Sequence, residues 1–128
     1  MSNHIHCLCR ASKGYSLSDI IRDYKKFTAK KIIKLIEVGA ESRKEWMLKK
    51  FEYAGQRLNR ISNYKFWKDD NHAIEISDLE TKLIEQKLDY IHNNPMNSMI
   101  VFEPQEYVFS SAKDYCNEKG LVNIVRMH

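Results

Sequence analysis

The sequence predicts an α+β fold in which a small antiparallel sheet is flanked by helices, and three observations lead to this prediction. Two long stretches, beginning near Leu17 and Leu79, repeat apolar residues at the spacing of an amphipathic helix. Two short segments, 64–67 and 72–76, are rich in the aromatic and β-branched residues that favour strands. The 128-residue chain is long enough for one core and has no repeat or linker, so we expect a single domain over residues 1–128.

The chain is expected to open with a strand and a long helix. The segment NHIHCLC is apolar at alternate positions, which predicts a strand. The helix is expected to begin after Ser16, whose hydroxyl can cap it, with Asp19 in its first turn, and to end near Val38 and Gly39. Its apolar positions are Leu17, Ile20, Ile21, Tyr24, Phe27, Thr28, Ile32, Leu35 and Ile36.

A second helix is expected from about residue 41 to residue 58, followed by the two short strands around a turn at 69–71. A third helix is expected to begin at Ser77, with Glu80 completing a capping box. It is expected to stop at Pro95, because proline cannot continue a helical hydrogen-bond pattern. The tail gives no clear pattern.

Composition limits the cellular setting. No run approaches the roughly 18 apolar residues of a membrane helix, and no secretory signal opens the chain, so a cytoplasmic protein without membrane attachment is expected. Three cysteines, an odd number, argue against a disulfide framework. Cys7 and Cys9 are expected to be reduced, small buried residues on the strand face opposite the histidines.

Charge is distributed unevenly along the chain. Residues 1–68 hold 16 Lys/Arg against 6 Asp/Glu, whereas residues 69–128 hold 5 against 11, although the net charge is only +4. This asymmetry suggests a polyanion contacted mainly by the first half. The alternative is that oppositely charged helices balance one another within the fold.

His4 and His6 are candidate metal ligands. Side chains two apart on a strand point to the same face, so both imidazoles can reach one ion. A histidine pair alone supplies too few ligands, and many such pairs are incidental. If the strand bulged, the two thiols could join the histidines in a zinc site.

Tyr90 and Asn94 are four residues apart near the end of the third predicted helix. This spacing places their side chains on one helix face, about 40° apart. Tyr90 lies at the edge of the apolar side, where a tyrosine can present its oxygen to a ligand. Most helix tyrosines at such an edge serve only as partly buried packing residues.

The first helix carries a ladder of four basic residues at four-residue spacing. Like charges at this spacing repel one another, and a nucleic-acid backbone would relieve the repulsion and release counterions. A solvated helix face is the alternative. Aromatic residues beside Lys65 and Lys68 could stack unpaired bases, or could form a strand's core face. The basic ladder consists of Arg22, Lys26, Lys30 and Lys34.

Five segments follow one another in an order that resembles a known family. They are MSNHIHCL, LSDIIRDYKKFTAKKI, KFWKDDNHAIEI, QKLDYIHNNP and EYVFSSAKDY, and they cover nearly the whole chain. The combination resembles the REP-associated branch of the single-tyrosine HUH transposases. The paired HIH and YIHNNP are its most specific parts.

The resemblance implies a ferredoxin-like HUH endonuclease fold and a metal-dependent DNA nickase and strand transferase. His4 and His6 match the histidine pair that binds Mg²⁺ or Mn²⁺, and Asn94 stands where a third ligand is often found. Tyr90 matches the nucleophile that forms a 5′-phosphotyrosine intermediate. The implied partner is single-stranded DNA beside a hairpin.

Two departures from the family pattern carry expectations of their own. Family members usually place another strand and helix before the histidine strand, so the domain is expected to be amino-terminally truncated. The exposed sheet edge this would leave predicts pairing with a second chain, as a homodimer. The family also usually has a glycine near Ser98 or Met99, where a turn needing positive φ would be strained without one.

Two other functions stay open. The chain could be a catalytically decayed remnant that binds hairpin DNA without cutting it. It could also be a structural zinc protein that uses His4, His6 and the thiols.

Overall fold

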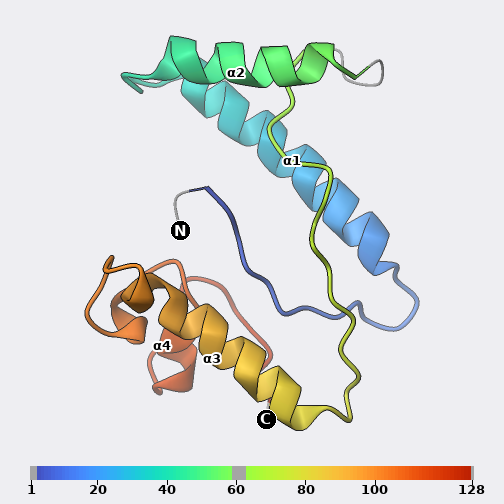
Figure 1. Cartoon of the computed structure of the whole chain (residues 1–128), viewed down its shortest axis with the longest axis vertical. Coiled ribbons are helices and arrows are strands. Elements are labelled where there is room, and N and C mark those ends of the chain that lie inside the picture. Colours follow the sequence, from blue (N-terminus) through green and yellow to red (C-terminus); the bar gives the residue numbers. More distant parts are fainter. Residues whose placement is uncertain (1–2, 59–62, 128) are drawn as a thin grey trace. The chain divides into compact units, whose positions relative to one another are not determined.

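The computed structural model describes residues 3–58 and 63–127, and the described chain folds as helices joined by extended segments (Figure 1). It divides into two compact units, of which the first comprises Arg10–Ala73 and the second comprises Met1–Cys9 with Ile74–His128. The first holds 16 Lys/Arg against 8 Asp/Glu, a formal charge of +8, and is called the basic unit. The second holds 5 against 9, a formal charge of −4, and is called the acidic unit.

Helix α1 spans Leu17–Val38, which confirms the predicted first helix. The Ser16 hydroxyl accepts a hydrogen bond from the Asp19 backbone N–H at 3.4 Å, as the capping prediction required. At the other end, the Gly39 N–H donates to the Leu35 carbonyl at 2.9 Å. A Cβ at Gly39 would lie 2.5 Å from that carbonyl oxygen, so the close approach that ends the helix needs a glycine.

Helix α2 spans Lys44–Gln56, shorter at both ends than the predicted 41–58. It packs against α1 within the basic unit, where Ile36 is buried. The turn between the helices is held by Glu41, whose carboxylate accepts from the Arg43 N–H at 3.0 Å, and by Lys44, whose ammonium donates to the Glu37 carbonyl at 3.0 Å.

The predicted antiparallel sheet is wrong, because residues 3–58 and 63–127 contain no strand. A strand needs a ladder of backbone hydrogen bonds to a neighbour, and NHIHCLC has an extended backbone without such a neighbour in the described chain. The described chain is therefore helical rather than α+β, and the predicted ferredoxin-like fold, which requires that sheet, is wrong as well. The homodimer was predicted from an exposed sheet edge, and the described chain has no sheet to provide that edge.

Segment 64–67, predicted as a strand, instead attaches to the two helices of the basic unit. The Lys65 N–H donates to the Phe51 carbonyl of α2 at 2.9 Å, and the Trp67 indole N–H donates to the Thr28 hydroxyl of α1 at 3.0 Å. The aromatic residues that favoured a strand therefore pack on helices. Beyond this segment, the carboxylate of Asp70 accepts from the backbone N–H of His72 at 2.7 Å and bends the chain there.

Helix α3 spans Thr81–Asn97, so both of its predicted ends are wrong. Ser77 and Glu80 make the expected contact, since the Glu80 carboxylate accepts from the Ser77 N–H at 2.9 Å, but this closes a turn before the helix. Pro95 lies inside the helix and is buried. Proline removes one N–H donor, yet the remaining bonds carry the helix about half a turn further.

The end of α3 is a Schellman motif centred on Met99. The Met99 N–H donates to the Met96 carbonyl and the Ile100 N–H donates to the Pro95 carbonyl, both at 2.9 Å. Met99 has φ +55°, the left-handed conformation that glycine adopts without steric cost. The expected positive-φ position without a glycine is therefore confirmed at Met99.

The carboxyl-terminal part of the acidic unit consists of a short 3-10 helix, η1 (Pro104–Glu106), and a single helical turn, α4 (Ala112–Tyr115). The 3-10 helix η1 contacts both α3 and α4. Ala112, Pro95 and the imidazole of His92 form the buried centre of this unit.

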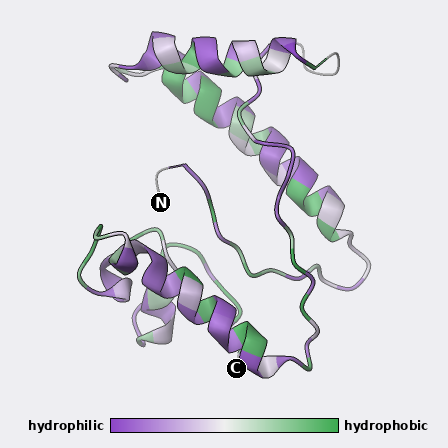
Figure 2. Cartoon of the chain, viewed as in Figure 1, coloured by the Kyte–Doolittle hydropathy of each residue, from purple (hydrophilic) through white to green (hydrophobic). Residues whose placement is uncertain are grey.

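Many large apolar side chains stay exposed, among them Leu17, Phe27 and Leu35 of α1. Figure 2 shows how hydrophobic and hydrophilic residues alternate along α1 and α3. Cys7 and Cys9 are exposed as well, so their predicted burial is wrong. None of the helices in the described ranges has both the length and the apolar character that crossing a bilayer requires.

Candidate active site

His4 and His6 lie next to each other in the acidic unit, as the sequence predicts for residues two apart on an extended backbone. Their ring centroids are 4.8 Å apart and the rings meet edge to face at 86°. The His4 ring is exposed, whereas His6 is half-buried. The extended backbone is thus enough to bring the two imidazoles to one side without a sheet.

Tyr90 of α3 reaches this histidine pair. Its ring centroid lies 5.4 Å from that of His6, and the two rings meet edge to face at 81°. The Tyr90 side chain is half-exposed, and its hydroxyl has no hydrogen-bond partner among the described residues. The amino-terminal histidine segment and the tyrosine late in the sequence therefore form one cluster.

Two polar atoms, one in the cluster and one on α3 near Tyr90, are buried without a partner in the described chain. They are the Nε2 of His6 and the side-chain oxygen Oδ1 of Asn94, one helical turn beyond Tyr90. A buried nitrogen or oxygen left without a hydrogen bond costs about 1–3 kcal/mol, so such atoms usually have a ligand, a water or an ion. An imidazole nitrogen and an amide oxygen are both metal-ligand atoms, so these residues fit a divalent ion.

The orientation of His4 supports the same role. Its Nδ1 lies 2.6 Å from the Asn3 side-chain oxygen. Because that oxygen can only accept, Nδ1 carries the proton and donates it. In this tautomer the lone pair lies on Nε2, and an outer hydrogen bond of this kind orients many metal-bound histidines.

The surroundings of His6 favour its neutral form. Burial lowers the pKa of His6, and the neighbouring His4 lowers it further. A neutral imidazole can bind a cation through its lone pair, whereas a protonated one cannot.

The opposite side of α3 is fixed by His92, a residue that the sequence analysis did not single out. Its Nε2 lies 2.9 Å from the Ser111 hydroxyl, and its ring centroid lies 5.0 Å from that of Tyr115 in α4. The Tyr115 hydroxyl in turn accepts from the Met127 N–H at 3.0 Å. Since residues two apart on a helix face nearly opposite ways, His92 anchors α3 while Tyr90 stays free.

The signal for His92 was present in the sequence, because it lies in YIHNNP while Ser111 and Tyr115 lie in SSAKDY. The two segments were recognised as parts of one family pattern, but their contact depends on the folded arrangement of η1 and α4.

The basic ladder lies on α1, in the basic unit, and all four of its side chains are exposed. Arg22 is already paired, with Asp19 at 2.5 Å and Asp23 at 3.0 Å. Lys26, Lys30 and Lys34 have no acidic partner among the described residues, so the free cations of the ladder are these three lysines.

The thiols do not join the histidines. Within residues 3–58 and 63–127 no group of three or more His, Cys, Asp or Glu side chains could hold a metal ion. The zinc site that would combine His4 and His6 with Cys7 or Cys9 is therefore not assembled in the described chain.

Comparisons with known proteins give no match: no protein-family model, curated protein or solved structure is similar to this chain. Membership of the single-tyrosine HUH transposases thus stays a prediction that depends on the five sequence segments.

Proposed function

We propose that this chain is a transposase-type enzyme that nicks single-stranded DNA near hairpins and transfers the cut strand through a 5′-phosphotyrosine. The observation that carries the proposal is the pairing of Tyr90 with His6, rings 5.4 Å apart, beside the unpartnered Oδ1 of Asn94. A nucleophile next to unsatisfied ligand atoms is the arrangement that phosphoryl transfer needs.

The reaction requires one exchange of bonds at phosphorus. The Tyr90 oxygen attacks the phosphodiester, the new Oη–P bond forms, and the bond from phosphorus to the 3′-oxygen breaks. The phenol loses its proton and the departing 3′-oxygen gains one, so the step consumes no net proton. Attack by another 3′-hydroxyl reverses it and joins two strands without a further energy source.

His4, His6 and Asn94 would hold Mg²⁺ or Mn²⁺ when the ion is bound, and it would supply charge stabilisation to the phosphate oxygens. The chain's own contribution is positioning. His92 fixes α3 through Ser111, and α3 then holds Tyr90 and Asn94 on its other side.

DNA binding is supported by charge. The basic unit carries +8, and three exposed lysines of α1 have no acidic partner in the described chain. Neutralising phosphates with such residues releases counterions and favours binding of any nucleic-acid strand.

Covalent capture tests the proposal. A pool of oligonucleotides, each with one hairpin between randomised single-stranded flanks and a 3′ fluorescent label, is incubated with the full chain and Mn²⁺. Attack by Tyr90 leaves the labelled 3′ fragment on the protein, so a fluorescent band that runs above the free protein is expected on a denaturing gel. Mass spectrometry should place the adduct on Tyr90.

Two variants sharpen the test. Tyr90→Phe removes the nucleophile and should abolish the adduct, whereas Tyr15→Phe removes another exposed tyrosine hydroxyl and should leave it unchanged. If wild type and Tyr90→Phe give the same result, the catalytic proposal fails.

The alternative, a catalytically decayed remnant that binds hairpin DNA, is favoured by the unpaired lysines alone. It predicts salt-dependent binding of the same oligonucleotides without any adduct. The capture assay therefore separates the two functions.

A further inference from the structure

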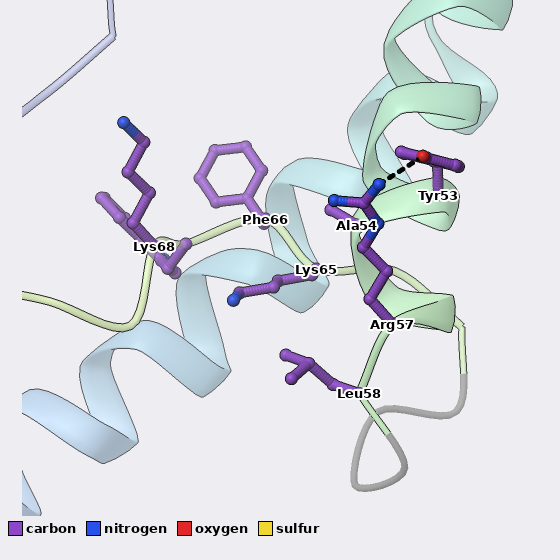
Figure 3. A pocket seen from close by; sticks show the side chains of 8 residues that line it. Tyr53, Ala54, Arg57, Leu58, Lys65, Phe66 and Lys68 are labelled. Carbon is purple, nitrogen blue, oxygen red and sulfur yellow. Dashed lines mark hydrogen bonds between the residues drawn. The ribbon is translucent and has the colours of Figure 1, made fainter.

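An open cavity of about 470 Å³ lies in the basic unit, beside the end of α2. One wall comes from α2 and the residues just after it, and the other comes from the segment that attaches to both helices (Figure 3). Its volume lies within the roughly 300–1,000 Å³ of typical ligand sites. It is lined by Tyr53, Ala54, Arg57, Leu58, Lys65, Phe66, Trp67 and Lys68.

The aromatic rings of the cavity are held in place by their neighbours. Phe66 lies 5.2 Å from Phe51 and 5.2 Å from Trp67, measured between ring centroids. The Trp67 indole donates to the Thr28 hydroxyl of α1, which fixes the direction of its ring. Rings fixed in this way lose little conformational freedom when a planar ligand stacks on them.

The cavity wall carries cations and no acid. The Arg57 guanidinium stacks on the Tyr53 ring, 4.6 Å from its centroid, and donates to the Tyr53 hydroxyl at 2.5 Å (Figure 3). Lys65 is paired with Asp69 at 2.6 Å. Arg57 and Lys68 have no acidic partner in the described chain, so two positive charges beside the rings are unneutralised.

A ligand complementary to this cavity has a flat aromatic part and a negative charge. We propose that the cavity binds one unpaired nucleotide of single-stranded DNA, with its base stacked on Trp67 beside the nearly perpendicular ring of Phe66 and its phosphate at Arg57 and Lys68. The inference rests on the proposed function for the choice of DNA, and it adds a second point at which the strand is held. Stacking on aromatic side chains tolerates any base, because every base has a flat face.

Tryptophan fluorescence provides a direct readout. The chain has two tryptophans, Trp67 in the cavity and the exposed Trp46 on α2. In the full-length Trp46→Phe variant, emission comes from Trp67. Titration with a twelve-residue oligothymidylate, which has little structure of its own, is expected to quench this emission. An abasic strand of the same length carries the same phosphates and should bind at least about five-fold more weakly without quenching.

Charge variants locate the phosphate contact. Arg57→Gln and Lys68→Gln, both at exposed positions, should each weaken oligothymidylate binding several-fold. Lys49→Gln removes a cation from an exposed position of α2 outside the cavity and is the matched control, expected to change affinity less than two-fold. Circular dichroism should show the same helix content in all variants.

Two results would overturn the inference: equal binding and quenching by the abasic strand, or an effect of Lys49→Gln as large as that of Arg57→Gln. Failure of the proposed function looks different. If no adduct forms on Tyr90 but quenching and its Arg57 dependence persist, the catalytic proposal falls and the cavity assignment stands.

Discussion

The imidazole of His92 and the hydroxyl of Ser111 lie 2.9 Å apart, and this contact joins α3 to the carboxyl-terminal part of the acidic unit. His92 is also among the most buried polar side chains, with 9% of its surface exposed. Since Tyr90 and Asn94 share this helix, the His92 contact determines where the candidate nucleophile is held.

The stability of the fold should fall in mild acid because of His92. Burial lowers the pKa of His92, so the folded chain binds fewer protons than the unfolded chain once the pH drops below about 6.5. Its contribution is complete above that pH and is lost as the pH falls toward the lowered pKa. His6, whose pKa burial also lowers, acts in the same direction.

Urea unfolding between about pH 7.5 and 5.5 measures this effect. The free energy of unfolding should fall by up to about 1.4 kcal/mol per pH unit for one proton. His92→Gln should flatten the dependence. An unchanged slope in His92→Gln would contradict the assignment.

Met99→Gly should stabilise the chain. Met99 is 92% exposed and has φ +55° at the glycine position of a Schellman motif, so the change removes strain and little packing. The expected gain in the free energy of unfolding is about 1 kcal/mol. Met96→Gly, inside the helix, is the control and should cost about 1 kcal/mol. The midpoints of urea unfolding measure both changes in stability. A loss of stability in Met99→Gly would argue against the Schellman motif.

The four residues of the basic ladder should contribute unequally to DNA binding. Lys26→Gln and Lys30→Gln are each expected to reduce the slope of log affinity against log salt concentration by about 0.7, the value per phosphate contact on a single strand. Arg22→Gln should change it less, because Asp19 and Asp23 already neutralise Arg22. Fluorescence anisotropy with labelled oligothymidylate measures the slopes, and three equal changes would refute the distinction.

Asn94→Leu should raise stability while removing the response to metal. Its Oδ1 is buried without a partner in the described chain, so an apolar side chain of similar size avoids a desolvation cost of about 1 kcal/mol or more. Mn²⁺ should raise the melting temperature of the wild type and leave that of Asn94→Leu unchanged.

Asn97→Leu, at an exposed position of the same helix, controls for the higher helix propensity of leucine and should keep the metal response. If Asn94→Leu still gains stability from Mn²⁺, Asn94 is not a ligand.

Local signals in the sequence predicted the first helix to its ends. Ser16 caps α1 through a bond to Asp19, three residues away, and Gly39 ends it through a bond to Leu35, four residues away. The strands were predicted from composition, yet a strand also needs a hydrogen-bonded neighbour that can be distant in the sequence. In the folded chain, the Trp67 indole instead donates a hydrogen bond to Thr28 on a helix. The predicted end of the third helix at Pro95 was also wrong, because α3 continues through Pro95 to Asn97.

In the candidate site too, local spacing was predictable, whereas contacts between residues distant in the sequence were not. Helix periodicity was enough to place Tyr90 and Asn94 on one face, and the two-residue spacing of His4 and His6 was enough to place those two rings together. The contact between His6 and Tyr90 was expected only from the family resemblance, and the structure contains it. His92 was missed because its role comes from Ser111, and the cavity was missed because Arg57 joins its aromatic wall only in the folded chain.

The two units carry opposite formal charge, +8 and −4, and in the proposed enzyme this would make ionic strength act on capture and cutting differently. Added salt would raise the DNA concentration needed for half-saturation, because counterions compete with the lysines for phosphates. The rate of strand cleavage once DNA is saturating would change little, since the contact between His6 and Tyr90 is between rings and is not an ion pair.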